Sequence, residues 1–371
     1  MNRRKFIGVA GGTFLATGAA GAGLYALSDR RNLVRADLEP DDGGGGGLLT
    51  ADERAILSLA PSGHNAQPRS VRRLGPLHWV VGNDSRRWLP AVDPDQRETV
   101  LSIGAFLQNL EFAAGALGYS CAWTLLAATN QDERVVEVKL TPGGKGSFDA
   151  AAIRDRRTVR SHFRGDPLAA SDLAGLVAGE SEFVHYLPAP GAESRTVNDL
   201  TVEANRLQSE RDPAQQELAD WVRFSGRAAA ARRDGLTTAG MEMDGVTAWA
   251  VRNFYDRGSV LTADFRRRGL DGVAAQVARS AGWLLVAGRD DSVAGLLDAG
   301  RRMERLFLRA RGLGVAVHPM TQVLEEPATK AAFERAFGGG GAVQFLLRVG
   351  YVNHYPPPVS LRRPAEWFVV P

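Results

Sequence analysis

Residues 60–68 form a polar loop that could hydrogen-bond the edge of a flat heteroaromatic ring. Its polar side chains and prolines include Pro61, Ser62, His64, Asn65 and Gln67. A loop of this composition presents amides and hydroxyls without covering them, and such groups suit a polar ring edge. A plain turn would have the same composition. A helical segment opened by Thr50, with Glu53 three residues later as in a capping box, precedes the loop.

Residues 153–160 form a dense cationic turn that could hold a phosphate monoester. The turn contains Arg156, Arg157, Thr158 and Arg160. Guanidinium groups offer forked donors to phosphate oxygens, which favours a phosphate site. A solvated run of charges is the alternative interpretation of the same stretch.

Two stretches nearer the C-terminus could complete such a site. Residues 312–321 end in His318, Pro319, Met320 and Thr321, and Arg362 and Arg363 follow a proline-rich loop. A packed histidine at a strand end is a more ordinary role for His318 than that of a catalytic acid, and no residue is assigned as catalytic. The single cysteine, Cys121, excludes a cysteine-based metal site, and no metal is expected.

The elements that would position these residues occur twice along the chain. An apolar stripe with a period near 3.6 predicts a helix over 101–117, which Gly118 would close before a strand over 121–128. Gly104, Leu110, Ala114, Leu117 and Gly118 recur 196 residues later (300 − 104) as Gly300, Leu306, Ala310, Leu313 and Gly314. Strands over 77–81 and 135–140 flank the first copy, as strands over 283–287 and 343–349 flank the second. This shared order predicts two related lobes in one polypeptide.

The overall composition is that of a globular protein rather than a nucleic-acid binder. Of 371 residues, 44% are hydrophobic and 23% charged, and 45 basic against 42 acidic residues give a net charge of +3. So small an excess of basic residues does not favour binding to a polyanion, and no nucleic-acid partner is expected.

The first thirty residues resemble a twin-arginine (Tat) export signal. Arg3 and Arg4 stand directly before a charge-free stretch from Phe6 to Leu27 that is rich in Gly and Ala. The stretch is long enough to serve as a membrane anchor, but its many glycines lower its hydrophobicity and favour the signal. We therefore expect the Tat translocase as a partner and a location in the periplasm or at the outer face of the cytoplasmic membrane. An uncleaved N-terminal tether would leave the same domain outside.

The motifs, taken in order, are similar to those of FMN-dependent nitroreductases. Residues 61–68 resemble the family's P-S-x-x-N-x-Q-P loop, and the form with His64 resembles its twin-lobed Acg branch. Residues 153–160 resemble the R-R-S-x-R signature, residues 312–321 the G-L-G…P-M segment, and residues 361–364 the K/R-x-R-x-P phosphate contact. The likeness covers nearly the whole chain after the signal. One departure is Arg69, where the family usually has Trp, and this puts the packing beside the loop in question.

This resemblance implies one FMN held between two lobes. Arg156 and Thr158 would contact the ribityl chain and phosphate, Arg160 the pyrimidine edge, and the amide after the strand at Val315 would approach flavin N5. The polar loop is present only in the first lobe. The arginine turn is present only in the second lobe, since its counterpart before the first lobe, residues 30–35, is at best a remnant. One composite site per chain is expected, in an internal pseudo-dimer that is monomeric.

The expected fold class is α+β, a nitroreductase-like fold with mainly antiparallel sheets flanked by helices. A signal or anchor would occupy residues 1–30 and a flexible linker residues 31–49. The first lobe would span residues 50–150, and the second residues 151–371 with a lid insertion near 223–243.

The resemblance also implies an oxidoreductase that reduces a small acceptor, such as a nitroaromatic or a quinone. Because NAD(P)H is not freely available outside the cytoplasmic membrane, the electron donor would be a quinol or a redox protein. The rival hypothesis is a non-catalytic protein that stores or shields FMN under a closed lid. A third, a scaffold without a cofactor, leaves the arginine turn unexplained.

Overall fold

The computed structural model describes residues 28–38, 50, 53, 57, 60–143, 146, 148, 151–338 and 342–370. Residues 1–27 of the predicted export signal and most of the predicted linker lie outside this set. Among the described residues, no helix combines the length and apolar character needed to cross a bilayer.

The first lobe is a five-stranded sheet with one long helix. Its elements in chain order are β1 (Arg69–Gly75), β2 (His78–Asn83), α4 (Arg97–Ala116), β3 (Tyr119–Leu125) and β4 (Arg134–Pro142). The strand order is β11-β1-β2-β4-β3, in which β11 (Val369–Val370) comes from the C-terminus and pairs parallel with β1. All other pairs in this sheet are antiparallel.

The second lobe repeats this plan. Its elements are β5 (Val184–Pro188), β8 (Gly282–Ala287), α13 (Val293–Gly312), β9 (Val315–Pro319) and β10 (Val343–Tyr351). The order β5-β8-β10-β9, antiparallel throughout, matches β1-β2-β4-β3 strand for strand. The predicted α+β class with two related lobes is therefore confirmed.

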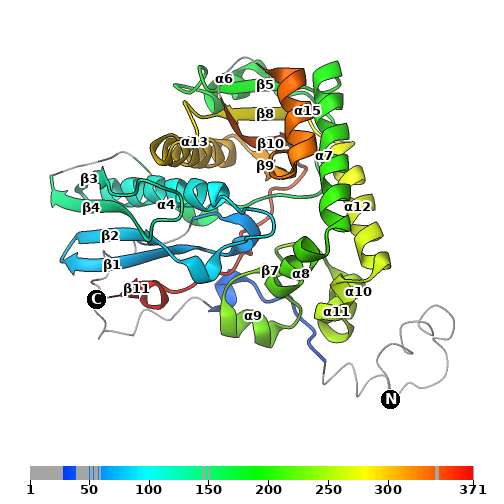
Figure 1. Cartoon of the computed structure of the whole chain (residues 1–371), viewed down its shortest axis with the longest axis horizontal. Coiled ribbons are helices and arrows are strands. Elements are labelled where there is room, and N and C mark those ends of the chain that lie inside the picture. Colours follow the sequence, from blue (N-terminus) through cyan, green and yellow to red (C-terminus); the bar gives the residue numbers. More distant parts are fainter. Residues whose placement is uncertain are drawn as a thin grey trace.

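Helices α4 and α13 lie side by side between the two sheets (Figure 1) and form the centre of the molecule. A Cβ placed on Gly104 would lie 2.2 Å from the carbonyl oxygen of Leu297, and one placed on Gly300 would lie 2.0 Å from that of Leu101. Leu101 and Leu297 are separated by the same 196 residues (297 − 101) as the two glycines. The contact is thus reciprocal, as across a two-fold axis, and only glycine permits so close an approach.

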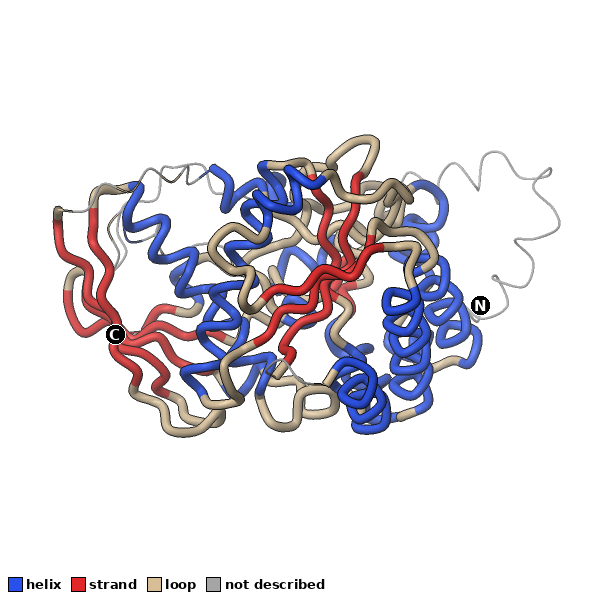
Figure 2. Tube along the Cα trace, turned by 90° about the horizontal axis from the view of Figure 1, so that it is seen from above, coloured by secondary structure: helices blue, strands red, loops and turns tan. Residues whose placement is uncertain are grey.

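The sheets differ in how they are covered. Every residue of β8 is buried, because α13 packs on one face of its sheet and α7 (Ala192–Glu210), α14 (Gln322–Glu325) and α15 (Pro327–Phe337) lie on the other. Strand β3 instead has no buried residue, and its more exposed positions alternate along most of the strand. Its sheet faces the core on one side only. Seen from above in Figure 2, strands, helices, strands and a second group of helices follow one another.

A helical insertion separates β5 from β8, where the first lobe has only a tight turn between β1 and β2. After α7 it contains α8 (Asp212–Trp221), β6 (Val222–Arg223), α9 (Gly226–Arg232), β7 (Leu236–Thr237), α10 (Gly245–Phe254), α11 (Arg257–Val260) and α12 (Ala263–Val277). The segment predicted as a lid, near 223–243, is one part of this larger insertion. Strands β6 and β7 pair within it as a small parallel sheet.

Residues at the junction of the predicted signal and the predicted linker lie against this insertion. Asn32 donates to the carbonyl of Met243 at 3.0 Å and accepts from the Thr238 hydroxyl at 2.7 Å. The amide of Asp29 donates to Asn253 at 3.0 Å. Residues 28–32 are therefore fixed to the insertion, although 28–30 end the segment predicted as a signal and 31–32 begin the one predicted as a flexible linker. The short helix η1 (Arg35–Leu38) follows them.

The remaining short elements lie in the connecting segments of the chain. They are η2 (Gly63–Asn65), η3 (Ser85–Arg87), α5 (Ala151–Asp155), α6 (Ala170–Leu176) and η4 (Ala365–Trp367). The predicted capping box is present: the Thr50 amide donates to Glu53 at 2.8 Å and the Glu53 amide donates to the Thr50 hydroxyl at 3.2 Å. Glu53 also accepts from the amide of Leu77 at 3.1 Å, which ties this segment to the turn before β2.

Candidate functional site

The polar loop after residue 60 is a tight turn held by its own serine. The Ser62 hydroxyl accepts from the amide of Gln67 at 2.8 Å, and the Ser62 carbonyl accepts from the amide of Asn65 at 3.0 Å. His64, Asn65 and Gln67 all have positive φ angles, of 48°, 53° and 55°. Left-handed backbone at three non-glycine residues is unusual, and such strain is concentrated at functional sites.

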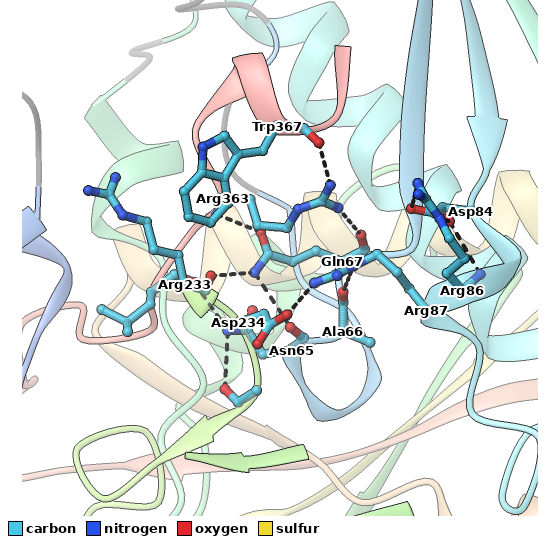
Figure 3. A network of polar contacts seen from close by, with 12 residues as sticks. Asn65, Ala66, Gln67, Asp84, Arg86, Arg87, Arg233, Asp234, Arg363 and Trp367 are labelled. Atoms are coloured by element: carbon cyan, nitrogen blue, oxygen red, sulfur yellow. Dashed lines mark hydrogen bonds and ion pairs between the residues drawn. The ribbon is translucent and has the colours of Figure 1, made fainter. Parts of the chain in front are cut away.

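A hydrogen-bond network supports the loop from behind (Figure 3). Gln67 is fully buried; its side chain donates to the carbonyl of Arg233 at 2.9 Å and accepts from the amide of Arg363 at 3.0 Å. The Arg363 guanidinium donates to the carbonyls of Gln67 at 3.2 Å and Trp367 at 2.7 Å. Gln67 and Arg363, both predicted to bind the cofactor, are thus used in joining the loop to the C-terminal segment and the insertion.

Arg69, where the resemblance implies an aromatic residue, packs against two aromatic rings. Its side chain is buried, and its guanidinium lies 5.1 Å from the ring centre of Phe106 and 4.8 Å from that of Phe368. Burial, with smaller effects of Arg363 and Arg87, lowers the pKa of Arg69 to about 9. The cation therefore packs between two aromatic rings, where the packing was in question.

The arginine turn follows α5 and contacts the insertion. Arg157 and the amides of Arg160 and Ser161 all donate to the carboxylate of Glu242, at 2.7, 3.0 and 2.8 Å. The Arg160 guanidinium donates to the carbonyl of Gly240 at 3.0 Å and to His318 Nε2 at 2.9 Å. Glu242 itself has a positive φ of 57°. One carboxylate of the insertion thus fastens it to the turn.

Arg156 points deeper than the other arginines of the turn. Its guanidinium lies 3.1 Å from the Glu304 carboxylate and 5.4 Å from the ring centre of Phe307, and both ionic side chains are buried. Arg156 still lines the cavity described next. The structure gives it a packing role between the lobes in addition to the predicted ligand contact.

The loop and the turn meet at a cationic pocket of about 80 Å³. Predicted site residues that line it are Pro61, Ser62, His64, Asn65, Arg156, Arg157, Thr158, Arg160 and Arg362. Gly235, Leu236, Thr237 and Gly240 of the insertion close another side of it, and Arg35 reaches it from the N-terminal segment. The pocket is therefore composite, with walls from both lobes, the insertion and the chain's two ends.

Positive charge in this pocket is not balanced. Arg362 donates to Asn65 Oδ1 at 2.8 Å, but its Nε is buried without a hydrogen-bond partner among the described residues. Burial lowers the pKa of Arg362 well below its usual range, and Arg156, Arg35 and Arg69 lower it further. Clustered, desolvated guanidinium groups are stabilised by an anion, and a phosphate dianion satisfies their donors best.

A larger cavity of about 380 Å³ adjoins the cationic pocket and shares Pro61, Ser62, His64, Thr158 and Arg160 with it. Pro319 and Thr321, both predicted site residues, line this larger cavity. Met320 does not: its side chain is buried in the core of the second lobe, and its amide donates to the carbonyl of Leu346 at 2.9 Å. The Thr321 hydroxyl donates to Glu98 at 2.9 Å.

His318 is a packed, neutral histidine, as its position in the sequence suggests. Its side chain is buried, and burial, with Arg160 and Arg348 nearby, lowers its pKa well below 6.5. It accepts a hydrogen bond from Arg160, which requires an unprotonated Nε2.

We expect His318 to make folding sensitive to acid. In the unfolded chain the imidazole takes up a proton near 6.5, whereas the folded protein holds it neutral, so the free energy of unfolding falls as the pH drops through and below 6.5. The contribution has a slope of up to about 1.4 kcal/mol per pH unit. Urea unfolding at a series of pH values should show a shallower slope in His318→Gln. His354→Gln, at an exposed position, is the control, and equal slopes in all three proteins would contradict the prediction.

Four charged residues that line the two cavities were not assigned to the site from the sequence: Arg35, Glu98, Arg266 and Glu325. Glu242, which accepts from Arg157 in the arginine turn, was not assigned either. Glu98 lies in the first turn of α4 and Glu325 at the end of α14, where carboxylates are ordinary surface residues. Their positions in the cavities depend on how the lobes dock, which local spacing does not encode. Among the described residues, no group of three or more His, Cys, Asp or Glu residues is arranged to hold a metal ion.

The fold and this site define a two-lobed α+β protein with a composite, cationic pocket beside a larger cavity. No family model matches the chain. It is 28% identical over 321 residues to "Putative NAD(P)H nitroreductase Rv3131" of Mycobacterium tuberculosis (strain ATCC 25618 / H37Rv), covering 84% of this chain and 88% of that protein. It is 25% identical over 314 residues to "Probable NAD(P)H nitroreductase PigM" of Serratia sp. (strain ATCC 39006), covering 80% and 86%. These matches support a place in the nitroreductase superfamily.

Among solved structures, the FMN-dependent nitroreductase NfnB of Mycobacterium smegmatis, solved in complex with NADPH, aligns with 54% of this chain and 86% of its own. The identity is 16% and the TM-score 0.34.

Proposed function

We propose that this protein binds one FMN between its lobes and acts as an oxidoreductase of nitroreductase type toward a small acceptor. The observation that carries the proposal is the meeting of the Asn65 loop with the arginine turn and Arg362 around one cationic pocket. Sequence likeness to proteins named as nitroreductases supports the same conclusion.

The residues present fit a phosphorylated flavin. Arg362 and Arg157 would hold the phosphate, since the donors of Arg362 are not all satisfied by the protein. His64 and Arg160 line both cavities, and Asn65 lines the cationic pocket beside them. These three residues would contact the flavin ring. FMN, when bound, supplies two-electron chemistry; the protein's residues bind it, orient it and exclude water.

The insertion would act as a lid over this site. Its backbone carbonyls at Gly235 and Gly240 accept from Asn65 at 3.2 Å and Arg160 at 3.0 Å, so it rests directly on residues from both lobes. A lid of this kind favours retention of the cofactor as well as exclusion of water.

The test is the visible spectrum and flavin content of the purified protein. We expect a yellow protein that retains about one FMN per chain and binds FMN more tightly than riboflavin, which lacks the phosphate. A colourless protein that binds neither ligand would overturn the proposal.

The second candidate function is storage or shielding of FMN, and the lid contacts favour it. Anaerobic mixing of chemically reduced protein with a nitroaromatic or a quinone separates the two functions. Rapid reoxidation of the flavin supports the enzyme, whereas flavin that stays reduced with both acceptors supports storage. NADPH and a soluble quinol, tested in turn as reductants, identify the donor class.

Glu242 should act as the latch of the lid. In Glu242→Ala the donors of Arg157, Arg160 and Ser161 lose their shared acceptor, so the segment 235–243 should open more often. Hydrogen–deuterium exchange of the backbone amides of residues 235–243 should rise about tenfold or more, as expected when hydrogen bonds to a charged group are lost. Glu210→Ala, which removes an exposed ion pair on α7, should leave their exchange unchanged. Equal protection in all three proteins would rule out the latch.

We also propose that the protein is exported by the Tat translocase and acts, as a monomer, outside the cytoplasmic membrane. The paired arginines and glycine-rich stretch of residues 3–27 support this. Replacing Arg3 and Arg4 with Lys should retain the protein in the cytoplasm, as measured by cell fractionation.

A further inference from the structure

The larger cavity is lined by groups of opposite charge. His64 and Arg160 line it where it meets the cationic pocket, and two carboxyl groups, Glu98 and Glu325, line it as well. Glu98 comes from the first lobe and Glu325 from the second, so the pair exists only because the lobes are docked. The cavity volume of about 380 Å³ is sufficient for a bicyclic ring.

The two carboxyl groups contact the same hydroxyl group, that of Thr321. The Thr321 hydroxyl lies 2.9 Å from Glu98 Oε1 and 3.3 Å from Glu325 Oε1, but it has a single proton and cannot donate to both. Two carboxylates this close do not both ionise, and one of them keeps a proton. The second oxygen of Glu98 faces the loop, 3.4 Å from where a Cβ on Gly63 would lie.

Neighbouring charges do not remove this proton. Arg97 donates to Glu98 at 3.1 Å, but its other nitrogen donates to the carbonyl of Gln344 at 2.9 Å. Asp93, which caps α4 through the amides of Glu98 and Thr99, adds negative charge on the same side. Burial raises the pKa of Glu325 well above its usual range, and Glu98 raises it further.

The terminal nitrogens of the one cation on the α12 side of this cavity have protein partners. Arg266 from α12 donates to the Asp212 carboxylate at 2.7 Å and to the carbonyl of Ser209 at 2.8 Å, and only its Nε is left without a partner among the described residues. Burial lowers the pKa of His64 to about 4, so it is neutral at physiological pH, and Arg160 lies toward the cationic pocket. A pyrophosphate or a carboxylate placed in this cavity would meet Glu98 and Glu325 without a free forked donor.

We propose that Glu98 and Glu325 share one proton and deliver it to an uncharged, carbonyl-bearing ring of the quinone class bound in the larger cavity. This inference rests on the FMN site proposed above. It adds an internal proton source and a preference for uncharged partners.

The proton balance of such a reduction requires a donor of this kind. A quinone becomes a hydroquinone by taking up two electrons and two protons. A hydride equivalent from reduced flavin accounts for both electrons and one proton, and the carboxyl pair supplies the second proton to the remaining oxygen. The pair is left fully ionised, and solvent returns its proton after the product leaves.

Infrared spectroscopy tests the shared proton directly and does not depend on FMN. At neutral pH, where ordinary carboxyl groups are ionised, the wild-type protein should retain the carbonyl stretch of a protonated carboxylic acid. Glu325→Gln should lose this band, and Glu98→Gln should shift it, because the acid that remains no longer shares its proton with a second carboxyl group. Glu334→Gln, at an exposed position on α15, should keep it. A wild-type protein without the band, or one whose band survives both substitutions, overturns the proposal.

Stopped-flow mixing of the reduced, FMN-loaded protein with menadione tests the transfer. Reoxidation should be about 100-fold slower in Glu325→Gln than in wild type or Glu334→Gln, the usual contribution of a positioned acid. The sulfonated, anionic analogue of menadione should react more slowly than menadione with wild type, and this difference should shrink in Glu98→Gln. Wild-type rates in both glutamine variants overturn the transfer step. A protein that binds no FMN overturns the proposed function instead, while the infrared band still decides whether the proton is shared.

Discussion

Gly300→Ala should disrupt the protein more severely than any single change on its surface. The added Cβ would lie 2.0 Å from the carbonyl oxygen of Leu101, so α4 and α13 must move apart along the centre of the molecule. Overpacking of a close helix contact costs about 3 kcal/mol. We expect a large drop in melting temperature, measured by circular dichroism, or accumulation of insoluble protein.

Gly312→Ala is the matched control for this change. Gly312 lies in the last turn of the same helix, and a Cβ there meets nothing within 4 Å. Alanine should therefore be neutral or stabilising by up to about 1 kcal/mol, since it favours helix over glycine. Gly104→Ala should behave like Gly300→Ala because its contact with Leu297 is the reciprocal one. If alanine is tolerated at both positions, the central helices are not packed as described.

Arg362→Ala should selectively abolish recognition of the phosphate. Arg362 is the buried guanidinium whose donors the protein leaves partly unused, so its loss removes charge-assisted hydrogen bonds from the ligand. The affinity for FMN should fall about 100-fold, and that for riboflavin much less. Flavin fluorescence titrations of the apoprotein give both dissociation constants. Arg362→Lys should be intermediate, because lysine keeps the charge without the fork.

Arg86→Ala provides the comparison for general charge effects. Arg86 is largely exposed and paired with Asp84 at 2.8 Å, outside the pocket lining. Its removal lowers the net charge equally but should leave the ratio of FMN to riboflavin affinity unchanged. Equal losses for FMN and riboflavin in Arg362→Ala would show that Arg362 supports the loop through Asn65 and does not read the phosphate.

The repeated core was predictable because each of its elements has a pattern that can be recognised within a short stretch of sequence. The helix stripes, the glycines that let two backbones touch and the strands around them recur at a fixed interval, and the structure has α4, β3, β4 and α13, β9, β10 at these places. The composite pocket was also predictable to the extent that each half, the Asn65 loop and the arginine turn, has a recognisable composition.

What was missed depends on contacts between distant segments. Strand β11 has only two residues, Val369 and Val370, which become a strand because β1 offers them an edge. The helices α8 to α11 have only four to ten residues each, too few turns for a repeating pattern to identify them, and only the segment near 223–243 was noticed. Glu98 and Glu325 look like ordinary helix-end charges until the lobes dock and bring them together.

The cationic pocket is built from segments spread along the chain, and this determines when it can form. Its walls come from Arg35, the loop at residues 61–65, the turn at 156–160, the insertion at 235–240 and finally Arg362, a few residues before the last strand joins the first. A chain that ends before Arg362 lacks one wall of the pocket. Under the proposed function, bound FMN would therefore report that these segments have met, and the proposed export by a transporter of folded cargo would follow that step.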